Sequence, residues 1–378
     1  MNRQRILLLS AVHPATDPRI LYKIAPSLAM HYEVFCALPN AHPDQQESNI
    51  AFINLPCFRQ LLSRLLFCHP VMLWKCLRIR PNLVHIFVPE LIPAAFLFKW
   101  LGAKIIYEVQ ENLYKKFSIK QFNNGLLFRS IFRLFDHLAR KSFFCVFTED
   151  AYLDEYDNLA FPHAIIHNYA SIPFINEYGV RRFAANDKPE FFYAGVISME
   201  RCFDVLVTAL SKLKSRYPDF KMHLFGSVRF QPDEAASLPG YAEIRPNLIF
   251  YGYTDQKTLL SYAKNALAGI ALLKPVADYP DSYTTKLFDY MALKLPVVAS
   301  DFPLYRRVVE QSECGFCISP YDAGILYQKL LWLIENPEKS AVMGRNGRKA
   351  VEMHYNWKQE EAVLLSFYQT ILEHSGES

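Results

Sequence analysis

The chain has 378 residues, which is too long for one ordinary hydrophobic core and predicts two domains of roughly 150–190 residues each. With 51% hydrophobic and 21% charged residues, the composition is that of a globular protein. The 41 basic and 37 acidic residues nearly balance, which argues against a general nucleic-acid binder. No apolar run approaches the roughly 20 residues that a membrane-spanning helix needs, and the first run, Ile6–Leu9, is too short for a signal peptide. Any membrane contact is therefore expected to be peripheral.

The charge is unevenly distributed along the chain. Between Ala51 and Thr148 there are 14 lysines and arginines but four acidic residues. A basic stretch that is also rich in aromatic residues is typical of a surface for anionic lipid or an anionic acceptor. A solvated face without a partner is the alternative, and the charge count alone leaves both open.

Short apolar runs alternate with segments of helical period, which is typical of strand–helix units with parallel sheets. The strands predicted in the first half are Ile6–Ser10, Val34–Leu38, Ala51–Leu55, Leu83–Val88, Lys104–Val109, Phe144–Phe147 and Ile165–His167. Helical patterns at Ile20–Met30 and Leu126–Lys141 lie between them. The first domain is predicted to cover 1–177, and the polar stretch 178–190 is predicted to be a linker.

A second series of elements follows the linker and predicts a second domain at 191–356. Its predicted strands are Phe191–Ala194, Lys221–Phe225, Leu248–Tyr251, Gly269–Leu273, Pro296–Ala299 and Phe316–Ile318. Its predicted helices lie near Phe203–Ser215, Asp255–Lys264, Thr285–Leu293 and Ala323–Glu335. The last segment, 357–378, is expected to form a helix that crosses back to the first domain. The fold class is α/β, with two Rossmann-like, doubly wound parallel sheets facing a cleft; ligands bind beyond the carboxyl ends of such strands.

The most informative stretch runs from Asp281 to Ser300 and predicts a polar loop, a helix and a buried strand. The helix opens near Thr284 and Thr285, where unpaired N–H groups and the positive end of the dipole attract an anion. Lys286 in the first turn opposes the helix dipole, which indicates that a bound anion compensates it.

Two carboxylates, Asp281 and Asp289, flank this helix start. Each can accept two hydrogen bonds from a vicinal diol such as a ribose; a capping loop with a surface aspartate is the alternative. The segment resembles the Glu-x7-Glu region of the retaining GT-B-fold glycosyltransferases of family 4, in particular their bacterial polysaccharide branch. The resemblance implies that Asp281 lies near the hydroxyls of the donor sugar and that Asp289 holds the ribose. Both family glutamates are aspartates here, one methylene shorter.

The start of the second domain is similar to the same family. The segment from Phe191 to Arg201 resembles the family's strand, glycine loop and basic residue. This resemblance implies that Gly195 lets the backbone approach the donor beside Ser198, and that Arg201 and Lys286 clamp the diphosphate. In the alternative interpretation Arg201 is a surface arginine.

Two further strand ends resemble those that line the base pocket in the family. They are His223-Leu-Phe225-Gly226 and Phe250-Tyr251-Gly252. We therefore expect the donor to contact Phe225, Gly226 and Tyr251, in addition to Thr284 and Thr285.

The first domain is similar to one branch of the family in two loops. His13, Asp17 and Arg19 match its first loop, and Gln110-Glu111 lies where the branch has His-Glu. The resemblance implies that these five residues contact the acceptor or the sugar. Gln110 can hydrogen-bond a sugar hydroxyl but cannot carry a proton as histidine does. A core-capping histidine is the alternative for His13.

Metal and cofactor motifs are absent from the sequence. There is no His-Glu-x-x-His, no Walker loop and no metal-holding Asp-x-Asp, and Cys314 and Cys317 form a single Cys-x-x-Cys without a second pair. We predict no metal and no cofactor, so Arg201, Lys286 and helix N–H groups must meet the charge of the leaving nucleotide.

The resemblance implies a retaining, metal-independent hexosyltransferase that uses a UDP- or GDP-sugar. The donor is expected on the second domain and the acceptor on the first, with the leaving phosphate taking the acceptor's proton. A nucleotide-sugar 2-epimerase of the same fold and a non-catalytic scaffold are the alternatives, the latter because of Gln110 and the two aspartates.

Two basic, apolar segments, Phe58–Phe67 and Lys115–Arg133, mix residues as interfacial helices do. They favour a lipid-linked acceptor, such as an undecaprenyl-diphosphate oligosaccharide, in lipopolysaccharide or other surface-polysaccharide assembly. The expected location is peripheral, at the inner face of the cytoplasmic membrane. Buried helices with snorkelling basic tips are the alternative.

Overall fold

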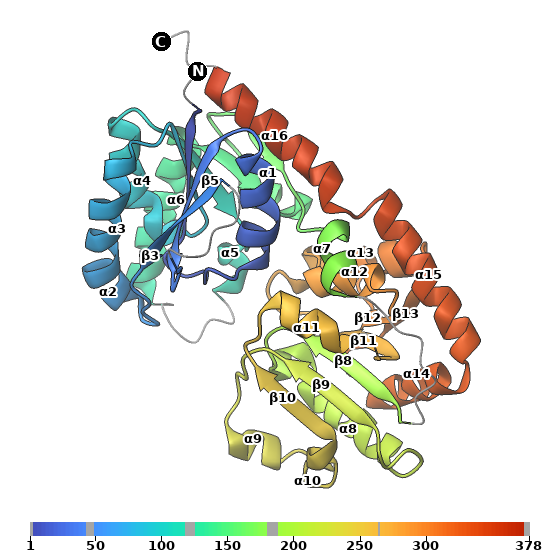
Figure 1. The fold of residues 1–378 in the computed structure, drawn as a ribbon. Helices are drawn as coiled ribbons and strands as arrows, with labels where there is room; N and C mark the ends of the chain where they lie inside the picture. Colours follow the sequence, from blue (N-terminus) through green and yellow to red (C-terminus); the bar gives the residue numbers. More distant parts are fainter. Residues whose placement is uncertain (1–2, 43–48, 118–124, 180–187, 264, 374–378) are drawn as a thin grey trace. The chain divides into compact units, whose positions relative to one another are not determined.

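The computed structural model describes residues 3–42, 49–117, 125–179, 188–263 and 265–373. The chain divides into two units, the first made of Met1–Asn168 and Trp357–Ser378 and the second of Tyr169–Asn356 (Figure 1). Each unit is built around one parallel sheet.

The first unit contains a seven-stranded sheet in the order β3-β2-β1-β4-β5-β6-β7, with every neighbouring pair parallel. Its strands are β1 (Arg5–Leu9), β2 (Glu33–Pro39), β3 (Ile50–Leu55), β4 (Leu83–Ile86), β5 (Lys104–Val109), β6 (Phe144–Phe147) and β7 (His163–Ile165). The strand order reverses between β1 and β4, and ligands of doubly wound sheets bind at the carboxyl side of such a reversal.

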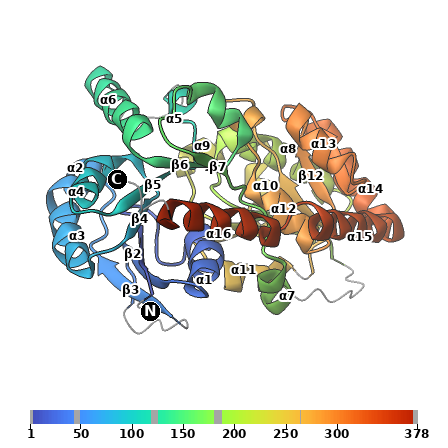
Figure 2. The ribbon, with the colours of Figure 1, turned by 90° about the horizontal axis from the view of Figure 1, so that it is seen from above.

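Helices cover both faces of this sheet. They are η1 (Ile20–Ile24), α1 (Ala25–Ala29), α2 (Leu61–Ser63), η2 (Arg64–Cys68), α3 (His69–Cys76), η3 (Leu77–Ile79), η4 (Pro89–Leu91), α4 (Ile92–Trp100), α5 (Leu113–Lys116), α6 (Leu126–Ser142), η5 (Asp150–Glu155) and α16 (Trp357–Glu373). Helices α3 and α4 lie on one face and α1 on the other (Figure 2).

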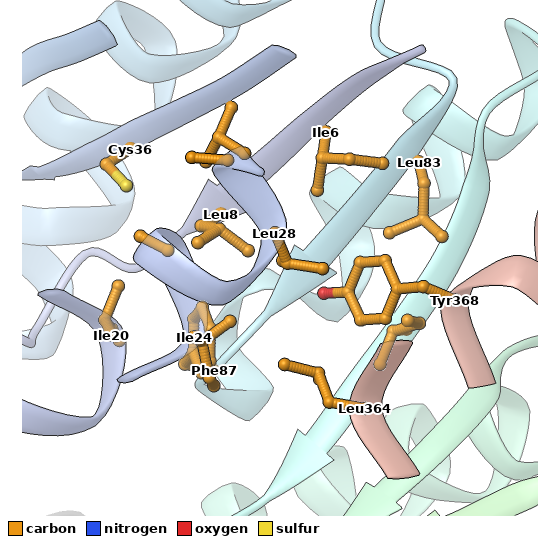
Figure 3. Close-up of a cluster of buried hydrophobic side chains, with 14 of the residues drawn as sticks. Ile6, Leu8, Ile20, Ile24, Leu28, Cys36, Leu83, Phe87, Leu364 and Tyr368 are labelled. Atoms are coloured by element: carbon orange, nitrogen blue, oxygen red, sulfur yellow. The ribbon is translucent and has the colours of Figure 1, made fainter. Parts of the chain in front are cut away.

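The alternation of side chains along β1 separates two cores. Ile6 and Leu8 point toward η1, α1 and α16, whereas Leu7 and Leu9 point toward α3 and α4. Figure 3 shows the first of these cores, in which Leu364 and Tyr368 of α16 lie against Leu83 of the sheet. A strand that is buried on both faces is continuously apolar, which explains why its sequence shows no polar alternation.

The second unit contains a six-stranded parallel sheet in the order β10-β9-β8-β11-β12-β13. Its strands are β8 (Glu190–Ala194), β9 (Lys221–Phe225), β10 (Leu248–Gly252), β11 (Ala268–Ala271), β12 (Val297–Ser300) and β13 (Gly315–Ile318). Its helices are α7 (Ile172–Tyr178), η6 (Met199–Arg201), α8 (Phe203–Lys214), α9 (Pro232–Ala236), α10 (Tyr241–Ile244), η7 (Arg245–Asn247), α11 (Gln256–Ala263), η8 (Tyr279–Asp281), α12 (Thr285–Ala292), α13 (Pro303–Val309), α14 (Ala323–Glu335) and α15 (Pro337–Met353). The order reverses between β8 and β11. The two sheets confirm the predicted α/β class with two Rossmann-like, doubly wound halves.

The boundary between the units differs from the one expected at residue 177. The second unit begins at Tyr169 because α7 packs on α11 and α12 of that unit. Most of the expected linker, 180–187, lies outside the described residues, and Glu190 already belongs to β8, in register with Lys221. The chain from Trp357 onward is part of the first unit, and its residues 374–378 lie outside the described ones.

We expect Leu364→Ala to destabilise the first unit. Leu364 is fully buried in the core that α16 shares with the sheet, so the truncation removes apolar contacts and leaves a cavity that costs about 2–5 kcal/mol. The neighbouring Val363 is exposed, and Val363→Ala is the matched control, with an expected change within about 0.5 kcal/mol. Urea denaturation followed by circular dichroism measures both; equal midpoints for the two variants would contradict the packing described here.

Candidate functional site

Two glycines lie beyond the carboxyl ends of neighbouring strands in the second sheet. Gly195 follows β8 with φ +132°, and Gly226 follows β9 with φ +130°. A β-carbon on Gly226 would lie 2.0 Å from the carbonyl oxygen of Gly195, so no larger residue fits there. The backbone bonds Gly195 N–H to Phe225 O (2.8 Å) and Gly226 N–H to Gly252 O (2.7 Å) tie the loops together. The two loops thus meet as bare backbone at the ends of β8 and β9, next to the reversal of the strand order between β8 and β11.

Arg201 and Lys286 meet beside the backbone of Gly195. A β-carbon at position 195 would lie 3.4 Å from Nη1 of Arg201 and 3.5 Å from Nζ of Lys286. The ammonium group of Lys286 donates to the hydroxyl of Tyr193 (3.3 Å), and the guanidinium of Arg201 lies over the ring of Tyr279 (5.6 Å to its centroid). Two cations predicted from separate segments of the sequence therefore lie next to one glycine.

Local backbone geometry places each of these cations. The carbonyl of Ser198 accepts from the N–H groups of Arg201 (3.1 Å) and Phe203 (3.2 Å), which forms the turn η6 that carries Arg201. Lys286 is the second residue of α12, and the hydroxyl of Tyr290 in the next turn accepts from Ala194 N–H (2.9 Å) at the end of β8. Helix α12 is thereby fixed against the strand that ends at the glycine.

The environment of Lys286 disfavours its own charge. Lys286 is only 5% exposed. Burial, together with the charge of Arg201, lowers the pKa of its ammonium group well below the usual value. Among the ion pairs of the described residues, neither Lys286 nor Arg201 is joined to a carboxylate. An anion bound here would supply the missing opposite charge.

The start of α12 adds backbone donors to this place. Thr284 precedes the helix with extended backbone (ψ 123°), and its side chain makes no capping hydrogen bond. Thr285 is exposed, so the first N–H groups of the helix remain open to a ligand. The arrangement can bind a phosphate-like anion by two cations and a helix N-terminus.

The two aspartates occupy different environments. Asp281 is exposed at the end of η8, the turn whose Tyr279 lies under Arg201. Asp289 is half-buried on α12, and its carboxylate accepts from Nε2 of Gln256 on α11 (3.3 Å).

An aromatic group lies at the ends of β9 and β10. The rings of Phe225 and Tyr251 stack at 4.2 Å with 6° between their planes, and the ring of Tyr262 lies 4.9 Å from that of Tyr251. The hydroxyl of Tyr251 is 3.0 Å from Nδ1 of His223. Phe225 and Tyr251 were among the predicted site residues, whereas Tyr262 was not. The sequence of α11 does not indicate that this helix faces the edge of the sheet.

The predicted site residues also did not include Tyr193 and Tyr279, which are the aromatic partners of Lys286 and Arg201. Burial raises the pKa of Tyr193 to about 12, so its hydroxyl stays protonated. The sequence offered one weak indication that these tyrosines belong to the site, namely their position. Tyr193 is two residues before Gly195, and Tyr279 is two residues before the predicted Asp281.

In the first unit, Arg19 is part of a buried network of hydrogen bonds. It is buried, and its guanidinium donates to both carboxylate oxygens of Glu108 (2.8 and 3.1 Å) and to the carbonyl of Ile166 (2.9 Å). Asp17 caps the following helix by accepting from the N–H groups of Arg19 and Ile20 (both 3.0 Å). Both residues thus make hydrogen bonds that stabilise the fold locally, and their expected contact with acceptor or sugar stays a prediction.

Glu108 is the centre of this buried network. Besides Arg19, it accepts from Nε2 of Gln110 (2.6 Å), and Nε2 of His85 lies 3.3 Å away. Nδ1 of His85 in turn is 2.6 Å from the hydroxyl of Tyr368 on α16. The guanidinium of Arg19 and the imidazole of His85 hold the pKa of Glu108 far below its usual range despite burial.

The other three predicted residues of the first unit line a cavity of about 630 Å³. His13 follows β1 and bonds to Ser10 Oγ (2.9 Å), and Gln110 and Glu111 follow β5. The structure therefore brings His13, Gln110 and Glu111 together and leaves Asp17 and Arg19 outside the lining.

The described residues contain neither a helix that could span a membrane nor a cluster of side chains that could hold a metal ion. No helix in this part of the chain is both long and apolar enough to cross a membrane. Within the same residues, no group of three or more His, Cys, Asp or Glu side chains could hold a metal ion.

The geometry of the second unit can now be compared with known proteins. Residues 177–350 match the family model described as glycosyl transferases group 1. The matched segment contains the two glycines, Arg201, Lys286 and both aspartates.

Among curated proteins, the chain is 29% identical over 168 residues to the phosphatidyl-myo-inositol mannosyltransferase of Mycolicibacterium smegmatis. The match covers 44% of this chain and 41% of that relative, so the chain spans about two fifths of the relative's length.

Solved structures share the whole fold. Sucrose-phosphate synthase from Thermosynechococcus elongatus aligns over 99% of this chain and all of that chain, with a TM-score of 0.75 and 17% identity. Anabaena HepE in complex with UDP and glucose aligns over 97% of this chain and all of that chain, with a TM-score of 0.72 and 13% identity. These likenesses confirm the predicted GT-B fold.

We expect Gly226→Ala to disrupt the glycine pair while Gly252→Ala does not. Both glycines have positive φ, but a β-carbon at 226 would strike the carbonyl of Gly195, whereas one at 252 meets nothing within 4 Å. Gly226→Ala should therefore lower the thermal unfolding midpoint, measured by circular dichroism, more than Gly252→Ala does. Equal effects of the two substitutions would mean that the close approach is unimportant.

Proposed function

We propose that this protein is a retaining, metal-independent glycosyltransferase of family 4. It transfers a hexose from a UDP- or GDP-sugar to a lipid-linked or polysaccharide acceptor in bacterial surface-glycan biosynthesis. The observation that carries the proposal is the pairing of Arg201 with the buried Lys286 beside Gly195. The match of the second unit to the glycosyl transferases group 1 model supports it independently.

The donor is proposed to bind the second unit with its diphosphate between Arg201, Lys286 and the first N–H groups of α12. Gly195 and Gly226 leave room for the phosphates to approach the backbone. The hydroxyls of Thr284 and Thr285 lie at the same helix start.

The rest of the nucleotide sugar is assigned to the surrounding residues. Phe225 and Tyr251 offer an aromatic surface to the base, and Asp289 accepts from the ribose hydroxyls. Asp281 accepts from the hydroxyls of the sugar, and Ser198 belongs to the loop that faces it. UDP is a reasonable first probe because the related fold of Anabaena HepE was solved with UDP and glucose.

In the proposed reaction, the bond between the anomeric carbon and the diphosphate oxygen breaks, and charge grows on the diphosphate. Arg201 and Lys286 stabilise that charge in a place from which water is largely excluded. The acceptor oxygen bonds to the anomeric carbon on the face that the diphosphate leaves. Its proton passes to the leaving phosphate oxygen, so the configuration is retained without an enzyme nucleophile.

The acceptor is assigned to the first unit, where His13, Gln110 and Glu111 line the cavity. A lipid-linked acceptor is supported by the name of the mycobacterial relative, which acts on a phosphatidyl-inositol. It is also supported by apolar residues that α6 exposes next to basic ones. A chain with these features would work at the anionic inner face of the cytoplasmic membrane.

The proposal is tested by incubating the protein with UDP- and GDP-sugars and a lipid-linked oligosaccharide in the presence of a chelator. The expected product has the anomeric configuration of the donor sugar, as measured by NMR. Lys286→Ala should reduce kcat/KM by about 10²–10³, because one preorganised donor to the leaving group is lost.

Lys212→Ala on the exposed side of α8 is the control and should retain full activity. A requirement for Mg²⁺ or Mn²⁺, an inverted product, or release of a free epimerised sugar would each overturn the proposal.

We further expect UDP binding to take up protons from solution. The pKa of Lys286 is lowered in the free protein, and a bound diphosphate favours the ammonium form and raises that pKa. Proton uptake is therefore largest when the pH lies between the pKa values of the free and bound states, and it falls toward zero below the free value. Calorimetry in buffers of different ionisation enthalpy measures it, and Lys286→Arg should remove it, since arginine remains charged. Uptake that is unchanged in Lys286→Arg would contradict the assignment to this lysine.

A further inference from the structure

We infer that the cavity of the first unit binds the hydrocarbon chain of the acceptor. This inference rests on the proposed function in one respect only, namely that the bound amphiphile is the acceptor. The occupant is a prenyl or acyl chain with a phosphate or phosphosugar head, and the two sources share the chemistry that the cavity recognises.

The cavity lies at the reversal point of the first sheet. Its base is formed by residues that follow three adjacent strands: His13 after β1, Phe87 after β4 and Gln110 after β5. Its walls come from α2 and η2 on one side, with Leu61 and Leu65, and from α5 and α6 on the other. A volume of about 630 Å³ is that of a site for a single organic ligand.

The acidic groups of the cavity are already neutralised. Glu90 pairs with Arg64 at 2.7 Å, and Glu111 pairs with Lys116 at 3.0 Å. Glu108 is held by Arg19, as described above. With these charges compensated, what the walls offer a ligand is mainly apolar surface, which a free sugar would not match but a hydrocarbon chain would.

Helix α6 has apolar residues on two faces. An inner row, Phe128, Phe132 and Phe135, lines the cavity. An outer row at helical spacing, Leu127, Ile131, Leu134 and Leu138, is exposed. A helix on the surface of a water-soluble domain needs only the inner row, so the outer row indicates contact with lipid.

The two rows meet at the mouth of the cavity. Leu127 and Ile131 belong to the outer row and also line the cavity, so the apolar lining continues onto the exposed surface. Arg129 and Arg133 on the same helix add positive charge, which complements a phosphate at the head of the chain. A hydrocarbon chain that leaves a bilayer could thus enter the cavity without crossing a polar surface.

The structure provides matched pairs of residues for a test. On α6, Ile131 (46% exposed) lines the cavity and Leu134 (57% exposed) does not. On η2, Leu65 (40% exposed) lines it and Leu66 (58% exposed) does not. An aspartate at a lining position places a charge against the chain, whereas the same change at its neighbour alters only the outer surface.

The probes are farnesyl phosphate and dodecyl phosphate, with dimethylallyl phosphate as the short control, all used below their micellar concentrations in calorimetry with the 378-residue chain. We expect the two long probes to bind and the short one to bind at least 10-fold more weakly, because each buried methylene is worth about fourfold in affinity. Ile131→Asp and Leu65→Asp should weaken binding of the long probes by about 10-fold or more. Leu134→Asp and Leu66→Asp should leave it within about twofold.

Equal losses in lining and control variants, or no dependence on chain length, would overturn the inference. The circular dichroism spectrum and the thermal unfolding midpoint, measured on the same samples, should be unchanged in all four variants and show that they are folded. If the long probes bind as expected but no sugar transfer is detected, the proposed function is wrong, while the inference that the cavity binds a hydrocarbon chain is supported. If sugar transfer occurs but the lining variants bind the probes as the control variants do, the inference fails and the proposed function stands.

Discussion

The close approach of two backbone loops is the constraint on which the second unit's site depends. Position 226 must lack a β-carbon, since the carbonyl of Gly195 occupies the space that a side chain there would need, and position 195 has a φ of +132°, which favours glycine. The approach brings the loop after β8 beside the end of β9 and leaves Gly195 open toward Arg201 and Lys286. Bare backbone, two cations and a helix N-terminus are therefore concentrated where the strand order reverses, which is the place that a doubly wound sheet reserves for ligands.

The two units treat buried cations in opposite ways. Arg19 in the first unit has a carboxylate, Glu108, that accepts from it twice, so its charge is neutralised within the fold. Lys286 in the second unit donates to the hydroxyl of Tyr193 and lies beside the repelling charge of Arg201, and no ion pair among the described residues joins it to a carboxylate. Burying a cation without a partner costs several kcal/mol. The first arrangement stabilises the fold, whereas the second leaves an electrostatic deficit that a bound anion can relieve.

The parts of this fold that the sequence predicts are those set by local pattern. Ile6, Leu7, Leu8 and Leu9 of β1 are all buried, and their continuous apolar run identifies the strand. Lys286 is recognisable because it stands in the first turn of a helix, where its charge opposes the dipole. The buried ion pair of Arg19 could not be predicted in this way, since its partner Glu108 is 89 residues away. Tyr279, whose ring lies under the guanidinium of Arg201, is likewise far from that arginine in the sequence.

The basic, apolar segments of the first unit show where periodicity alone fails. Arg64 belongs to a segment that resembles an interfacial helix, yet it is buried in a bidentate pair with Glu90. On α6 the same kind of pattern has a different outcome, because Asp136 and Arg140 pair inside the unit, with Tyr114 and Tyr156 bonding to the same carboxylate. This polar pair fixes the rotation of α6, and that rotation turns the phenylalanine row into the cavity and the leucine row outward. A helix that is apolar on two faces has two rotations of similar hydrophobic free energy, so the buried ion pair, and not hydrophobicity, decides which row lines the cavity and which is exposed.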